Sequence, residues 1–82
     1  MTVDNTMYNK KISEILNRYR KEEGLSLYKA AQVLDVTPQR VQQYETGGTI
    51  PGYRIRYWAI DPVKPKWVRR MASEMLRNVQ LT

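Results

Sequence analysis

The 82-residue sequence contains no cysteine and no histidine. The chain therefore cannot form disulfides, thiolate nucleophiles or zinc sites built from these residues, and it lacks the usual general base near neutral pH. The absence of cysteine also suits a reducing compartment. We expect neither a metal site nor a cofactor.

Long apolar runs are also missing. No segment approaches the roughly 18 apolar residues that cross a membrane, and the N-terminal stretch MTVDNTMYNKK contains no apolar signal core. The eight carboxylates are scattered among basic residues, and no glycine-rich loop is suited to hold a phosphate. We therefore expect a cytoplasmic protein that is not an enzyme.

The composition is that of a small folded protein. Hydrophobic residues make up 41% of the chain and charged residues 27%, which is typical of a globular domain rather than a disordered tail. A chain of this length forms one domain with a small core, so contact with a partner chain would add useful stability.

The net charge of +6 is concentrated in the second half of the chain. Residues 1–35 contain six basic and five acidic side chains, whereas residues 36–82 contain eight basic and three acidic ones. Such a surface favours a polyanionic partner, because basic side chains neutralise phosphates and release counterions. A solvated basic face that only keeps the protein soluble explains the charge equally well, so composition alone does not decide.

The first helix is predicted from apolar spacing. Four residues fall on one helical face: Ile12, Ile15, Leu16 and Tyr19. This pattern predicts a helix over residues 6–23, with Gly24 as its C-terminal stop. Residues 1–5 are expected to form a flexible N-terminal arm, and residues 6–82 a single domain.

Two further helices are predicted from capping residues. Ser26 is a good N-cap for a short helix over residues 27–34. Thr37 and Pro38 begin the next helix, because threonine caps well and proline at the first helical position loses no needed N–H group. That helix should end at the glycine pair at residues 47–48.

The turn between these two helices is very short, since only Asp35 and Val36 remain for it. The helices must therefore cross steeply and pack through small side chains, for which Ala31 is well placed. The inward-facing residues of the turn and the third helix are expected to be Val36, Val41 and Tyr44.

Residues 51–60 fit two patterns. Apolar residues alternate with arginines, as in a strand, at Tyr53, Ile55 and Tyr57. A helical stripe is also present, at Ile55, Trp58 and Ala59. We favour a short helix, because the preceding helices offer no sheet for a strand to join.

Prolines across residues 62–65 separate this element from a last predicted helix over residues 66–79. Its broad apolar stripe consists of Trp67, Val68, Met71, Ala72, Met75, Leu76 and Val79. The stripe closes the core of the monomer, contacts a partner chain, or does both. The candidate dimer contacts are Trp67, Met71, Met75, Leu76 and Val79.

The segment LSLYKAAQVLDVTPQRVQQYETGG resembles the helix-turn-helix of the phage repressor and Cro family, also called XRE-type regulators. The matching positions are Ala31, Leu34, the turn at Asp35 and Val36, the buried Val41 and Tyr44, and the closing Glu45-Thr46-Gly47. The resemblance covers about residues 16–51. The chain departs from it at Asp35, where the family commonly has glycine, and at Leu27, where relatives often have glutamine.

The resemblance implies an all-α, lambda repressor-like bundle of about five helices, with possible variation at residues 51–60. It also implies that the second helix of the motif enters the major groove of DNA with its N-terminal residues facing the bases. The expected base-reading residues are Gln39, Arg40 and Gln43, because glutamine pairs well with adenine and arginine with guanine. The expected DNA backbone contacts are Lys29, Thr37, Pro38, Gln42, Gly48, Thr49, Tyr53, Arg54 and Arg56.

The function that this resemblance implies is a sequence-specific regulator of transcription, a repressor or Cro-like protein of a bacterial or phage-infected cell. We expect a homodimer on a pseudo-palindromic double-stranded DNA operator, because one helix-turn-helix of this size rarely reads enough sequence. The alternative is a small protein-binding module, or an antitoxin, that grips a partner protein through its C-terminal apolar helix.

Overall fold

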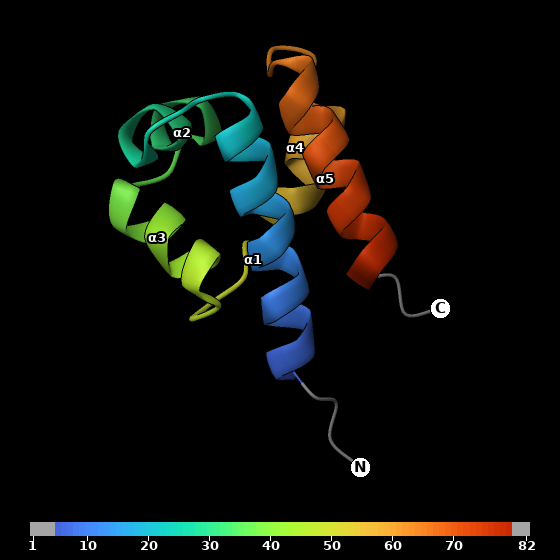
Figure 1. Ribbon diagram of the computed structural model, residues 1–82. Coiled ribbons are helices and arrows are strands. Elements are labelled where there is room, and N and C mark those ends of the chain that lie inside the picture. Colours follow the sequence, from blue (N-terminus) through green and yellow to red (C-terminus); the bar gives the residue numbers. More distant parts are fainter. Residues whose placement is uncertain (1–4, 80–82) are drawn as a thin grey trace.

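The computed structural model describes the backbone of residues 5–79 and the side chains of residues 10–78. Within this range the helices are α1 (Asn5–Glu22), α2 (Leu27–Leu34), α3 (Pro38–Thr46), α4 (Arg54–Ile60) and α5 (Lys66–Val79). The predicted all-α fold with a helix-turn-helix is confirmed (Figure 1). Helix α1 begins one residue earlier than expected, and residues 1–4 of the predicted arm lie outside the described residues.

Helix α1 runs between two helix pairs (Figure 1). It packs against α3 on one side and α5 on the other, while α2 packs on α3 and α4 packs on α5. The largest fully buried side chains come from four of the five helices: Ile12, Leu16, Leu34, Val41, Val68, Met71 and Met75. The core therefore joins both pairs through α1.

The two predicted N-caps are present. The Oγ atom of Ser26 accepts a hydrogen bond from the backbone N–H of Lys29 at 3.1 Å. Thr37 Oγ1 accepts one from Arg40 N–H, also at 3.1 Å. Each cap satisfies one of the backbone N–H groups that the first turn of a helix leaves without a partner, so α2 and α3 both start where the sequence predicts.

The turn between α2 and α3 depends on Asp35, which adopts the left-handed conformation with φ 58° and ψ 43°. Aspartate tolerates this region better than most residues other than glycine, so the turn closes at a modest cost. The backbone N–H groups of Asp35 and Val36 both donate to the carbonyl of Ala31 and end α2.

Helix α4 confirms the helical interpretation of residues 51–60, although it begins at Arg54 rather than near Pro51. Residues 51–53 form a turn instead, with Gly52 in the left-handed conformation at φ 63°. Trp58 is buried and donates from its indole Nε1 to the carbonyl oxygen of Leu34 at 3.3 Å. This hydrogen bond ties α4 to the end of α2.

Helix α5 closes the core of its own chain. Its residues Val68, Met71, Ala72 and Met75 are all fully buried. Met71 and Met75 are therefore not on a surface that a partner can reach, which corrects their expected role as dimer contacts and as the stripe of a protein-binding module. Trp67 and Leu76 are only partly buried, and the side chain of Val79 lies outside the described residues.

Glu74 links α5 to α1. Its carboxylate accepts hydrogen bonds from Arg18 Nη2 at 2.5 Å and from Tyr19 Oη at 3.0 Å. The hydrogen bond from the Arg18 guanidinium, with help from Tyr19, lowers the pKa of Glu74 below its ordinary value. Among the described residues, no helix is long and apolar enough to span a membrane.

Candidate functional site

Helix α3 separates its residues sharply by direction. Val41 and Tyr44 face the core, with exposed fractions of 0% and 3%. The polar residues of the opposite face are all exposed: Gln39, Arg40, Gln42 and Gln43. No carboxylate occurs between Val36 and Tyr44, so this exposed face carries amides and one guanidinium but no negative charge.

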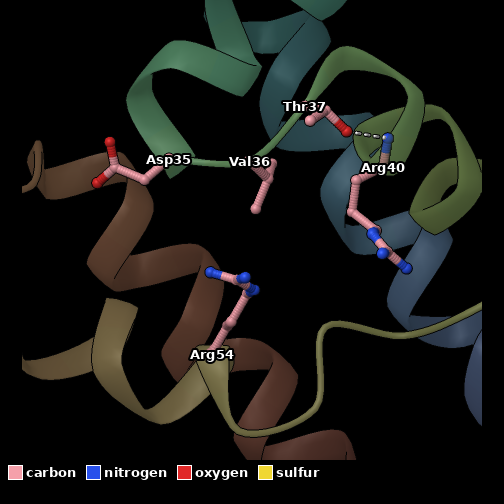
Figure 2. Close-up of a pocket in the computed structure, with 5 residues that line it drawn as sticks. All are labelled: Asp35, Val36, Thr37, Arg40 and Arg54. Atoms are coloured by element: carbon pink, nitrogen blue, oxygen red, sulfur yellow. Dashed lines mark hydrogen bonds between the residues drawn. The ribbon is translucent and has the colours of Figure 1, made fainter.

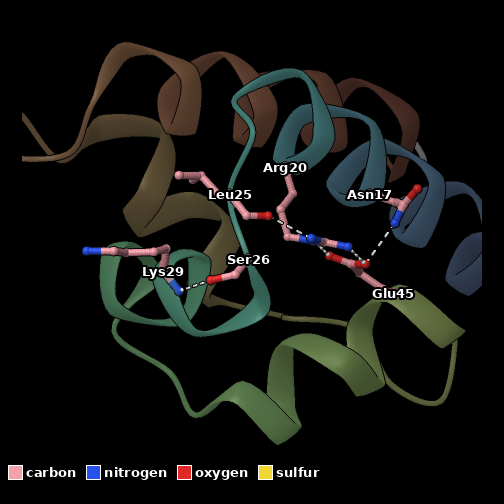
Figure 3. A network of polar contacts seen from close by, with 6 residues as sticks. All are labelled: Asn17, Arg20, Leu25, Ser26, Lys29 and Glu45. Atoms are coloured by element: carbon pink, nitrogen blue, oxygen red, sulfur yellow. Dashed lines mark hydrogen bonds and ion pairs between the residues drawn. The ribbon is translucent and has the colours of Figure 1, made fainter.

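The first acidic residue after this face, Glu45, has a structural role. Its carboxylate lies 2.5 Å from Arg20 Nε on α1 and also accepts a hydrogen bond from Asn17 Nδ2 at 2.8 Å (Figure 3). Both side chains of the ion pair are largely buried, with exposed fractions of 16% for Arg20 and 9% for Glu45. The pair fixes the end of α3 against α1 and neutralises the charge of Glu45.

Arg20 extends this network to the start of the motif. Its Nη1 donates to the carbonyl oxygen of Leu25 at 2.7 Å, just before the Ser26 cap of α2 (Figure 3). Hydrogen bonding to Glu45 raises the pKa of Arg20 above its ordinary value. The network was not predicted, because Glu45 was matched only as part of the closing motif. The basic residues in the last turn of α1 were the available signal.

An open pocket of about 500 Å³ lies between the start of α3 and the start of α4. It is lined by Asp35, Val36, Thr37, Arg40 and Arg54 (Figure 2). The structure thus brings together three predicted DNA contacts, Thr37, Arg40 and Arg54. The Arg54 guanidinium also lies 5.8 Å from the centre of the Tyr53 ring.

The other predicted contacts are spread over several elements. Lys29 is exposed on α2, and Gly48 and Thr49 lie in the loop after α3 and its C-cap Gly47. Tyr53 and Arg56 are exposed at the start of α4, and the exposed fraction of Tyr53 is 69%. Gln42 is exposed, whereas Pro38 is partly buried. None of these residues is among those that line the pocket with Thr37, Arg40 and Arg54.

Residues 16–55 match a protein-family model described as helix-turn-helix. The match spans just under half of the chain and runs from the middle of α1 to the start of α4. No curated protein and no solved structure is significantly similar to the chain. Proteins with such domains are typically not enzymes.

Proposed function

We propose a function that is more specific than DNA binding. Its premise is that residues 16–55 are a helix-turn-helix domain of the XRE/Cro/C1 type, and that such a domain implies a DNA-binding regulator. The chain is a phage repressor-like or Cro-like regulator that occupies a double-stranded DNA operator in the cytoplasm. By doing so it blocks or recruits RNA polymerase. Helix α3 enters the major groove.

The observation that carries this proposal is the exposed face of α3, which is polar and free of carboxylates. Surface helices ordinarily mix acidic and basic residues, but a carboxylate here would meet the phosphates that border the groove. Gln39 and Gln43 are four residues apart and therefore share one side of the helix. Each can pair with an adenine edge, and a good bidentate pair contributes about 1–3 kcal/mol of discrimination.

Contacts to the DNA backbone flank this face and set its register. We propose that they come from Thr37, Pro38 and Gln42 on α3, and from the neighbouring Lys29, Gly48, Thr49, Tyr53, Arg54 and Arg56. Arg40 is expected to read a base, and its side chain also lines the pocket beside Arg54. That position suits a phosphate better than a base edge.

We propose that the protein binds as a homodimer, with half-sites about 34 Å apart. On α5 the remaining candidate contacts are Trp67 and Leu76, which are both partly buried, and Val79, whose side chain lies outside the described residues. Trp67 and Leu76 are nine positions apart, so they lie on opposite edges of the buried stripe and a single partner surface would cover one of them. Mass measurement in solution, with and without the operator, tests this assembly.

Base reading is tested with a duplex that the wild-type protein selects from a random pool. Gln39→Ala and Gln43→Ala should each relax the preference at one position of each half-site, with about a tenfold loss of discrimination. Gln42→Ala is the matched control, because it removes the same side chain from the same helix and should weaken binding to all sequences alike. An unchanged preference in both Gln39→Ala and Gln43→Ala would contradict the assignment.

A further inference from the structure

We propose that the open pocket between α3 and α4 binds a phosphodiester group of the DNA backbone, held between the guanidinium groups of Arg40 and Arg54. A third residue, Lys64, keeps the pocket suitable for an anion by neutralising Asp35 at its rim. The inference rests on the proposed function and deepens it, because it assigns one part of the DNA to one site on the protein.

The pocket pairs two arginines, Arg40 and Arg54. They come from different helices, yet both line the same pocket of about 500 Å³. Within the described part of the chain, neither Arg40 nor Arg54 forms an ion pair with a carboxylate. A guanidinium donates two parallel hydrogen bonds to phosphate oxygens, so two of them are well suited to a group that carries its charge on two oxygens.

The shape of the pocket favours the same kind of occupant. Arg54 rises from α4 on one side and Arg40 extends from α3 on the other, with Val36 and Thr37 above them (Figure 2). Arg40 is exposed and Arg54 is half-buried, so the pocket opens to solvent rather than enclosing its contents. Small-molecule sites bury most of their ligand. An open site of this size is better suited to a polymer whose chain enters and leaves.

Asp35 also lines the pocket, and its carboxylate would repel a phosphate at this rim. Lys64 Nζ lies 2.5 Å from Asp35 Oδ2 and forms an ion pair with it. The Lys64 side chain is only 12% exposed, whereas that of Asp35 is 76% exposed. The Asp35 carboxylate lies on the far side of the turn from both arginines (Figure 2). Lys64 is therefore a positioning residue that directs the carboxylate away from the pocket and cancels its charge.

The test of the pocket is a set of binding curves for wild type, Arg40→Gln, Arg54→Gln and the double variant. Each is measured on the selected duplex and on a random duplex between about 50 and 200 mM salt. Each single variant should lose roughly tenfold in affinity on both duplexes, because a charge-assisted hydrogen bond is lost. The double variant should lose less than the product of the two, since both side chains hold the same group.

The salt dependence gives the sharpest distinction. Loss of one phosphate contact lowers the slope of log affinity against log salt by about 0.9, and loss of two lowers it by about 1.8. We expect the double variant to lose about 0.9. Arg70→Gln removes one exposed charge from α5 and serves as the matched control, with an unchanged slope. A slope loss near 1.8, or an altered sequence preference in Arg40→Gln, would overturn the assignment.

Inorganic phosphate distinguishes the source of the group. Arginine side-chain N–H signals of Arg40 and Arg54 should shift only weakly when inorganic phosphate is added without DNA, and strongly when the duplex is added. Saturable binding of inorganic phosphate that the duplex fails to displace would assign the pocket to a free ion and overturn the DNA backbone as its occupant.

The role of Lys64 is tested by a double-mutant cycle with Asp35. Lys64→Gln should weaken binding severalfold in the wild-type background and have no effect together with Asp35→Asn, since asparagine keeps the left-handed turn but carries no charge. An equal loss in both backgrounds would show that Lys64 contacts DNA itself and would overturn its positioning role. If the wild-type protein binds no duplex, the proposed function fails. If it binds but these variants behave otherwise, only the pocket assignment fails.

Discussion

Helices α3 and α5 are both amphipathic, but they use their faces in different ways. Helix α3 buries two side chains and exposes a broad polar face without acid, whereas α5 buries four of its described side chains in the middle of the core. Helix α3 is held in place by its own Val41 and Tyr44, which pack in the core, and by the ion pair between Glu45 at its end and Arg20 of α1. Helix α5 therefore serves mainly the core, whereas α3 combines core contacts with the exposed face for which we propose DNA recognition.

The largest expected effect is a loss of stability when a core side chain of α5 is truncated. Met71→Ala leaves a cavity in the core and should lower the free energy of unfolding by about 2–5 kcal/mol. Gln43→Ala, on the exposed face of α3, should change it by less than about 0.5 kcal/mol. Urea denaturation of both variants checks the contrast, and equal stability losses would contradict the division of roles.

The next effect concerns the anchor between α3 and α1. Glu45→Gln leaves the largely buried guanidinium of Arg20 without its counter-charge and should cost about 1–3 kcal/mol in the free energy of unfolding. Because the same contact orients the end of α3, binding to the selected duplex should weaken as well. Denaturation and anisotropy on the same preparation check both readouts. A Glu45→Gln variant with wild-type stability would contradict the role of Glu45 as an anchor of α3.

The smallest effect is a pH dependence from Glu74 on α5. Its pKa is lower in the folded protein than its ordinary value, chiefly because of the hydrogen bond from Arg18. The stability it contributes is therefore present above that ordinary value and is lost as pH falls through the folded value. Glu74→Gln should flatten the fall of stability in this acidic window and leave DNA recognition at neutral pH unchanged. Thermal unfolding at successive pH values checks this.

Local signals were sufficient to predict the helix-turn-helix. The Ser26 and Thr37 caps, the proline after Thr37 and the small Ala31 each act within a few residues of the structure that they determine. Helix α4 was placed three residues too early because its start depends on a turn at Gly52 that apolar spacing does not report.

Contacts between distant segments could not be predicted from the sequence. A seven-residue apolar stripe on α5 does not say what covers it, and only the packed structure shows Met71 and Met75 inside the chain's own core. The pairs Arg20–Glu45 and Lys64–Asp35 join residues that are 25 and 29 positions apart. Charge complementarity alone does not choose such partners among 22 charged residues.

The central claim is that the acid-free face of α3 meets DNA, and placing one carboxylate on that face tests it most directly. Gln43→Glu is nearly isosteric and keeps a good helix former, so the fold should be unchanged. Arg70→Gln on α5 lowers the net charge by the same one unit and controls for overall electrostatics. The account predicts that Gln43→Glu loses most of its affinity for the selected duplex while Arg70→Gln retains it. Equal affinities of the two variants would contradict it.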